Sequence, residues 1–295
     1  MPLRIAALLT CHNRRETTVA CLRALRKQAS PKLTFQFSML DGPSNHNPKS
    51  IIPNQNTPIL IEVFLVDDGC TDGTADAVCE IWPEATIIHG DGNLFWCGGM
   101  RVAWARAAKT DPDYFLLLND DTKLLPSALE SLLEIVPDPD CRCISVGAIA
   151  DPLTGDKTYG GTALPPLHFP SPDGKPQECI LFNGNSVLVP QAVFKEIGAF
   201  HHAFTHSLGD ADYSHEARRH GIRIFETAVA VGTCGRNPVV GTWKDQSISR
   251  YHRLLKLKSP KGLPYPEWLI FCQRNCGKQW LRYFFSPTLR ILVGR

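Results

Sequence analysis

The chain has 295 residues, 43% hydrophobic and 20% charged, with a formal net charge of +2, which suits one large globular domain or a domain with an appendage. Its eleven cysteines form no Cys-x-x-Cys pair, and no signal-peptide pattern precedes the first apolar run, so we expect reduced thiols in a cytoplasmic enzyme rather than a disulfide scaffold or a structural zinc site. No apolar run is long enough to span a bilayer.

The first half of the chain alternates apolar runs with segments of helical spacing. The expected strands are Leu3–Leu9, Ile59–Val66, Thr86–His89 and Tyr114–Leu118. The expected helices are Thr17–Lys27, Thr74–Ile81 and Gly98–Thr110. This alternation predicts an α/β fold with a mostly parallel central sheet flanked by helices. Residues 30–58 are rich in Pro, Asn and Ser and are expected to form an insertion.

The second half is less regular. Expected strands are Ile144–Ile149, Ile180–Phe182 and Ser186–Val189, and expected helices are Gln191–Ile197 and Asp210–His220. Gly221 is expected to close the last of these helices.

The C-terminal segment is basic. Residues 244–295 hold eleven Lys and Arg against two acidic residues, a net charge of +9, so residues 1–243 carry −7. Aromatic side chains are interleaved with these basic residues, a pattern typical of an interfacial or anion-binding surface. We therefore expect peripheral membrane contact through 244–295, the alternative being a partly amphipathic helix packed on the domain. The segment has no recognisable nucleic-acid reading motif, so no nucleic-acid partner is expected.

The most informative motif is a strand that ends in acid. The buried run Tyr114–Leu118 leads directly into Asn119-Asp120-Asp121. Carboxylates at the carboxyl end of a central strand must face solvent, a cation or a ligand. A second acidic motif, Asp210-Ala211-Asp212, follows downstream. One acidic group to hold a metal and another to accept a proton are the minimum needed to move a group from a phosphate ester to a hydroxyl.

Two further loops follow predicted strands. In Asp67–Thr74, an acid can accept hydrogen bonds from a nucleoside base or ribose, but a turn with a helix cap by Asp72 or Thr71 explains the pattern equally well. In Asn93–Arg101, a glycine pair lets the backbone approach a ligand near a helix N-terminus.

The order of these motifs, together with Thr10-x-x-Asn13-Arg14 after the first strand, resembles family 2 glycosyltransferases of the GT-A fold over about residues 3–230. Within that family the chain is most similar to bacterial rhamnosyltransferase-like members that act on cell-surface polysaccharides. The resemblance implies a Rossmann-like GT-A domain at 1–240, with a nucleotide-sugar half to about residue 122 and an acceptor half after it. A basic helical extension follows at 241–295.

The resemblance also implies roles for individual residues. Nucleotide-sugar contacts are implied at Thr10, Cys11, Arg14, Asp67, Asn93, Gly99, Asn119 and Asp120. Asp121, with Asn119, occupies the Asp-x-Asp position that binds a divalent cation, Mg²⁺ or Mn²⁺. Asp210 occupies the general-base position, where Gly209 replaces the glutamate usual before it. Acceptor-binding or supporting roles are expected at Asn183, Gly184, Asp212, Trp96 and His252, against the alternatives of a plain turn, a core tryptophan and a surface histidine.

We therefore predict an inverting, metal-dependent glycosyltransferase that uses a nucleotide-diphospho sugar. The acceptor is expected to be a glycan or lipid-linked hydroxyl in cell-surface polysaccharide or glycolipid synthesis, in the cytoplasm or at the inner face of the membrane. A sugar-nucleotide pyrophosphorylase would carry a Gly-rich basic loop after the first strand, which residues 10–14 do not supply. A catalytically degenerate nucleotide- or glycan-binding protein stays open because of Asn119 and Gly209.

Overall fold

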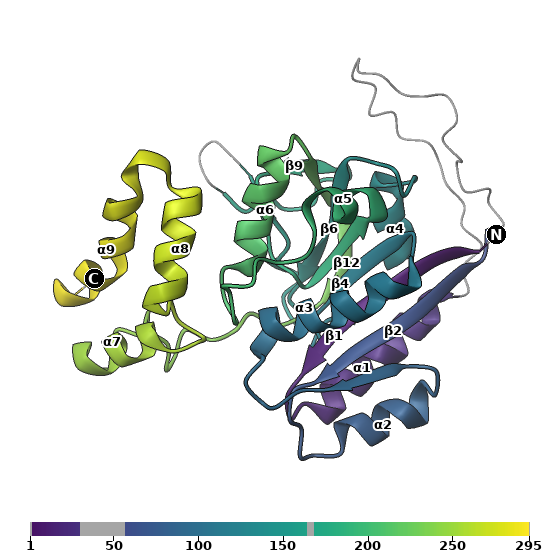
Figure 1. Ribbon diagram of the computed structural model, residues 1–295, viewed down its shortest axis with the longest axis horizontal. Helices are drawn as coiled ribbons and strands as arrows, with labels where there is room; N and C mark the ends of the chain where they lie inside the picture. Colours follow the sequence, from purple (N-terminus) through teal and green to yellow (C-terminus); the bar gives the residue numbers. More distant parts are fainter. Residues whose placement is uncertain (1, 30–56, 164–167, 295) are drawn as a thin grey trace.

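The computed structural model describes residues 2–29, 57–163 and 168–294. The predicted insertion lies almost wholly outside these residues. A ten-stranded mixed sheet forms the centre of the molecule, with β3-β2-β1-β4 as its parallel half (Figure 1). These strands are β1 (Leu3–Cys11), β2 (Ile59–Asp67), β3 (Thr86–His89) and β4 (Tyr114–Leu118). Their near-continuous apolar sequences follow from burial on both faces of the sheet.

The sheet continues through an antiparallel strand, β11 (Ser186–Pro190), between β4 and β6 (Cys143–Ala150). The long strand β12 (Arg223–Thr233) pairs in parallel with β6. It also pairs antiparallel with β5 (Lys123–Leu124), which is the last strand of the row. Short strands complete the pairing: β7 (Lys157–Tyr159), β9 (Gln177–Cys179), and the separate pair β8 (Gly161–Thr162) and β10 (Leu181–Phe182).

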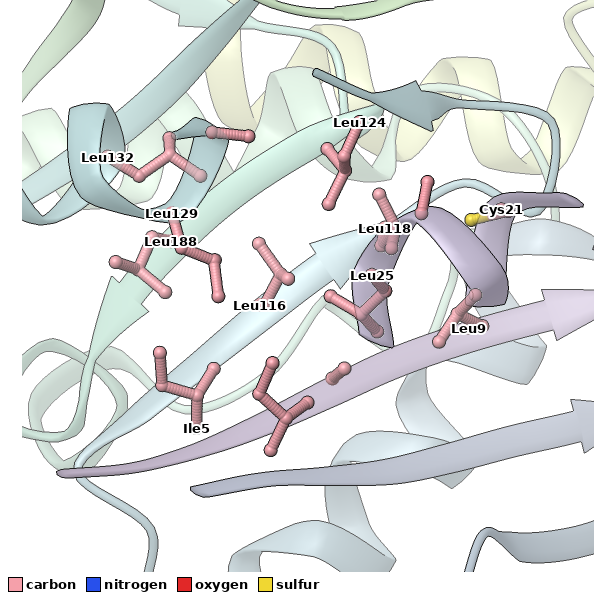
Figure 2. Packing of buried hydrophobic residues seen from close by; sticks show 14 of the residues in the cluster. Ile5, Leu9, Cys21, Leu25, Leu116, Leu118, Leu124, Leu129, Leu132 and Leu188 are labelled. Carbon is pink, nitrogen blue, oxygen red and sulfur yellow. The ribbon is translucent and has the colours of Figure 1, made fainter. Parts of the chain in front are cut away.

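Helices cover both faces of the sheet, and alternate residues of each strand serve each face. One core packs β1 residues such as Ile5 and Leu9 against α1 (Arg15–Arg26), α2 (Thr74–Ile81) and α4 (Ala128–Ile135) (Figure 2). The other core packs Ala6 and Leu8 against α3 (Phe95–Ala107), α5 (Gln191–Ile197) and α6 (Gly209–Arg219). The central strands β1 and β4 are therefore buried on both faces, and their carboxyl ends are the parts that are free to bind a ligand.

The C-terminal extension forms three helices, α7 (Arg250–Lys258), α8 (Tyr265–Asn275) and α9 (Trp280–Leu292). Helix α8 lies beside α6, and α9 packs against α8 and α7 (Figure 1). Short 3₁₀ turns occur at Lys27–Ala29, Ala108–Thr110 and Gly277–Gln279. None of the helices in the described part of the chain is both long and apolar enough to traverse a bilayer.

The mostly parallel sheet flanked by helices confirms the predicted fold class. The bounds of α2, β3, β4 and α5 agree with the predicted ranges. The other predicted elements differ from the structure at their ends. The difference is largest for the helix expected at Gly98–Thr110, which begins at Phe95, so that both Gly98 and Gly99 lie inside α3. Helix α4 and strand β12 are not among the elements predicted from the sequence.

Candidate active site

The acidic end of β4 is held by an arginine from the end of β1. Arg14, which directly precedes α1, donates from Nη1 to Asp120 Oδ1 at 2.8 Å and lies with Nη2 2.9 Å from Asp121 Oδ2. The Thr18 hydroxyl donates a longer bond, 3.5 Å, to the other oxygen of Asp120. Burial raises the pKa of Asp120 to about 6, although the guanidinium beside it acts in the opposite direction. The strand ends of β1 and β4 thus form one charged cluster.

Asp121 has one carboxylate oxygen without a partner. Its Oδ1 is buried and has no hydrogen-bond partner among the residues that the structure describes, whereas Oδ2 faces Arg14. An uncommitted carboxylate oxygen is the kind of ligand that Mg²⁺ or Mn²⁺ takes together with substrate phosphates. The side chain present at this position therefore fits a hard divalent cation.

Asn119 does not offer its carbonyl oxygen in the same way. Asn119 Oδ1 accepts the indole N–H of Trp96 at 2.6 Å. The edge of the indole's six-membered ring lies against Gly184, where a Cβ atom would come within 2.3 Å of the ring. Trp96 therefore joins the β4 end to the loop before β11. That loop lies here because β11 runs antiparallel to β4, with Ser186 opposite Leu118.

Asp210 lies at the other side of this loop, in the first turn of α6. Its Oδ2 accepts the Gly184 N–H at 3.3 Å, and Oδ1 accepts the Ala211 N–H at 2.8 Å. Burial raises the pKa of Asp210, against the effect of these backbone hydrogen bonds. A carboxylate with a raised pKa is a stronger base toward a hydroxyl proton. Three predicted motifs, around residues 96, 119 and 184, are thus connected to the predicted base.

The structure also accounts for Gly209. A Cβ atom at this position would lie 2.2 Å from the Sγ atom of Cys97, a fully buried residue in the first turn of α3. A glutamate would need the Cys97 side chain to move, so the packing of Cys97 against the start of α6 fits the departure from the family pattern.

Asp212 contacts the C-terminal extension rather than Asp210. Its buried carboxylate accepts hydrogen bonds from Arg274 at 2.9 and 3.2 Å and from the Asn275 amide at 2.7 Å. Glu267 of α8 adds a second tie, accepting the Thr205 N–H in the loop before α6 at 3.1 Å. The extension therefore supports the element that carries the predicted base.

The residues expected to border the base form the ends of β1 and β2, where Cys11 lies opposite Asp67. Ligand atoms of Cys11, Asp67 and Cys70 lie within 4.8 Å of one another. Burial raises the pKa of both thiols, which disfavours a cation here because metal ligation requires the thiolate. Thr10 faces the opposite side and packs where Gly99 has no side chain, since a Cβ there would lie 2.2 Å from Thr10 Oγ1. Close helix–strand packing therefore accounts for Gly99.

Asp68 has a structural role that the sequence pattern does not predict. Its carboxylate accepts three backbone N–H groups, from Gly92, Leu94 and Phe95, at 2.8 to 3.2 Å. It thereby caps α3 and explains why this helix begins before the glycine pair. The only sequence feature that indicates this role is an acidic residue directly after a strand.

Asp72 plays a similar part at the start of α2. Its carboxylate accepts the Thr74 N–H at 3.1 Å, as the alternative of a helix cap predicts.

The remaining predicted residues do not belong to the set of contacts that connects the end of β4 to Asp210. Asn93 is exposed, and its N–H donates to Asp91 Oδ1 in a local turn. Asn183 donates its N–H to the Gly160 carbonyl. His252 is exposed in the first turn of α7, where its ring and its N–H both contact the Ser249 hydroxyl. Arg101 donates to backbone carbonyls of His201 and Phe204 and so stabilises the loop ahead of α6.

Comparisons with known proteins agree with the fold. The mannosyltransferase PcManGT from Pyrobaculum calidifontis, solved with GDP-Man and Mn²⁺, matches with a TM-score of 0.54 at 14% identity, covering 99% of this chain and 70% of that one. TarS from S. aureus, solved with UDP-GlcNAc, matches with a TM-score of 0.53 at 14% identity, covering 96% and 73%. At such identities the likeness concerns the fold. The sequence of no curated protein matches the chain. A family model described as glycosyl transferase family 2 matches residues 7–198, and the chain therefore belongs to the family 2 glycosyltransferases.

Proposed function

We propose that the protein is an inverting glycosyltransferase that moves a sugar from a nucleotide-diphospho sugar to an acceptor hydroxyl. The observation that carries this proposal is the chain of contacts from the acidic β4 end through Trp96 and Gly184 to Asp210. It joins a carboxylate suited to a cation with a carboxylate suited to accept a proton. Family membership and the fold of the nucleotide-sugar complexes named above support the donor class.

Asp121 would hold the divalent cation. Its unpartnered Oδ1 supports this role, and a structural neighbour was solved with Mn²⁺. A hard cation bound here would neutralise negative charge on the departing nucleoside diphosphate, so that no protein acid is needed. Arg14 fixes the other oxygen of Asp121 and both orients the carboxylate and adds positive charge at the same end of the sheet.

Asp210 would remove the proton of the acceptor hydroxyl as the hydroxyl oxygen bonds to the anomeric carbon. The bond from that carbon to the phosphate oxygen breaks on the opposite side, so one in-line displacement inverts the anomeric centre. The Gly184 N–H orients Asp210 Oδ2, and the raised pKa makes the carboxylate a better proton acceptor. The ends of β1 and β2, with Asp67, would bind the base, and the acceptor would enter beside Asn183 and Gly184.

Two substitutions test this assignment. Asp210→Asn keeps the shape of the side chain and removes its basicity, so transfer is expected to fall by a factor of about 10² to 10⁴ while nucleotide affinity stays unchanged. Nucleoside diphosphate release from UDP-GlcNAc, GDP-mannose and dTDP-rhamnose measures turnover, and thermal stabilisation by UDP, GDP, dTDP and CDP with Mn²⁺ or EDTA measures binding. Asp173→Asn, at an exposed turn, is the matched control. Unchanged turnover in the Asp210 variant would refute its role as the base, and stabilisation by no nucleotide would favour a degenerate binding protein.

A further inference from the structure

Helix α9 has two apolar faces, and only one of them is used for packing. The inner face packs Phe284, Pro287 and Ile291 toward the other helices of the extension, and Pro287 and Ile291 are buried. The outer face carries four large side chains: Leu281, Phe285, Leu289 and Leu292. Their spacing of four, four and three residues aligns them along one side of a helix. Each is between 50% and 55% exposed.

This exposed stripe is concentrated rather than scattered. Of the fourteen large hydrophobic side chains exposed in the described residues, eight belong to the extension. They are Tyr251, Leu255, Leu281, Tyr283, Phe285, Leu289, Leu292 and Val293. Single exposed apolar residues are normal on any surface, but an aligned group on one helix marks an interaction surface.

Two exposed basic side chains lie near the stripe: Arg282 is next to it on α9, and Lys278 lies in the turn just before the helix. Residues 244–295 carry a net charge of +9, whereas the rest of the chain is acidic. An apolar stripe bordered by Lys and Arg fits the boundary between acyl chains and anionic headgroups. There the apolar side chains contact the acyl chains and the basic side chains contact the headgroups.

We propose that this outer face of α9, with its flanking basic side chains, docks on an anionic lipid bilayer. The helix has 13 residues, about 20 Å at 1.5 Å per residue, which is shorter than the hydrocarbon core. It therefore lies in the interface plane with Leu281, Phe285, Leu289 and Leu292 directed into the acyl region. This inference rests on the proposed transferase function and adds to it the class of acceptor. Docking would bring the acceptor site to a membrane, where lipid-linked hydroxyls are found.

A continuous set of contacts connects this surface to the predicted base. The Trp268 indole on α8 donates to the Phe284 carbonyl on α9 at 3.1 Å. Further along α8, Arg274 pairs with Asp212 on α6. Because Asp210 lies in the first turn of α6, docking of α9 fixes the orientation of the acceptor site relative to the bilayer.

The test is co-sedimentation of the full chain with vesicles. Vesicles of phosphatidylglycerol and phosphatidylcholine in equal parts are compared with phosphatidylcholine alone. We expect binding to the anionic vesicles that weakens as salt is raised. Phe285→Ser/Leu289→Ser and, separately, Lys278→Glu/Arg282→Glu should each weaken binding by roughly tenfold or more. Leu153→Ser, at a side chain that is 93% exposed outside the extension, should bind as the wild type does.

The outcomes separate this inference from the proposed function. Failure of the wild type to bind anionic vesicles, or wild-type binding by both double variants, would overturn the membrane surface. A wild-type dimer that becomes monomeric in Phe285→Ser/Leu289→Ser, without vesicle binding, would also overturn it and make the face an interface between copies. Nucleotide-dependent thermal stabilisation is measured on the same samples: if it persists while vesicle binding fails, the transferase proposal stands and only the docking inference falls.

Discussion

Replacing Asp212 with alanine removes the carboxylate that joins α6 to the C-terminal extension. Asp212 is 2% exposed, and its oxygens accept three hydrogen bonds from Arg274 and Asn275. The substitution leaves the Arg274 guanidinium with Glu216 as its remaining carboxylate partner. We expect the extension to loosen from α6 and the whole protein to become less stable.

The size of the effect follows from burial. Removing one partner of a buried ion pair costs about 3–5 kcal/mol, because the other charge stays desolvated. The Arg274 side chain is 30% exposed and can regain some water, so the lower end, about 3 kcal/mol, applies. With an unfolding entropy of roughly 2.1 cal/mol/K per residue over 295 residues, this lowers Tm by about 5 °C.

Differential scanning calorimetry of Asp212→Ala and Glu178→Ala checks the reasoning. Glu178 receives two 3.0 Å bonds from Arg223, so it is also a carboxylate bonded by two nitrogens of one arginine, but both side chains are more than half exposed. An exposed pair contributes less than about 1 kcal/mol, so this control should shift Tm by no more than about 1–2 °C. Limited proteolysis should cleave the extension of the Asp212 variant first. Equal Tm shifts in the two variants would refute the view that Asp212 is the buried anchor of the extension.

Three further predictions concern the site itself. Gly184→Ala would place a methyl group 2.3 Å from the rigid Trp96 ring, so we expect the free energy of unfolding to fall by about 1–3 kcal/mol. Turnover should fall at least about tenfold because the hydrogen bond from residue 184 to Asp210 shifts. An unchanged Tm and an unchanged rate would contradict this packing. Asp121→Ala should abolish the Mn²⁺-dependent part of nucleotide stabilisation in a thermal-shift assay, and an unaltered metal response would locate the cation elsewhere. Because the pKa of Asp210 is raised and the base acts when ionised, kcat/KM should fall as pH drops through a value above the usual carboxyl range near ~4; a pH–rate profile without that acid limb would argue against Asp210.

The parallel half of the fold was predictable from local pattern. Strands β3 and β4 and helix α2 are bounded by polar or glycine residues, and their apolar runs are long enough to identify. The strand β12 was missed because Glu226 interrupts its apolar run. That carboxylate is buried and lies 2.6 Å from Lys157 Nζ, a long-range partner that no local pattern reveals. A buried charge in a strand becomes acceptable only when tertiary structure supplies its partner.

The site was predictable as a set of motifs but not as a set of contacts. The family pattern led to Asp121 and Asp210, whereas the interactions that connect them depend on β11 running antiparallel beside β4. Trp96 illustrates the limit. Its sequence environment allows a sugar-stacking ring or a core ring. Only the structure shows that its N–H donates to Asn119 and that the edge of its ring lies against Gly184.

The departure at Gly209 can be understood together with Asp212. In the family pattern a glutamate precedes the base, but here Cys97 occupies the space that its side chain would need. The next acid along the helix, Asp212, faces away from the site and pairs with Arg274. Support for Asp210 therefore comes from two other sources, the Gly184 N–H on one side and the anchoring of α6 to α8 on the other. This makes the position of the proposed base depend on the extension, so docking of α9 on a membrane, as inferred above, would act on the helix that carries Asp210.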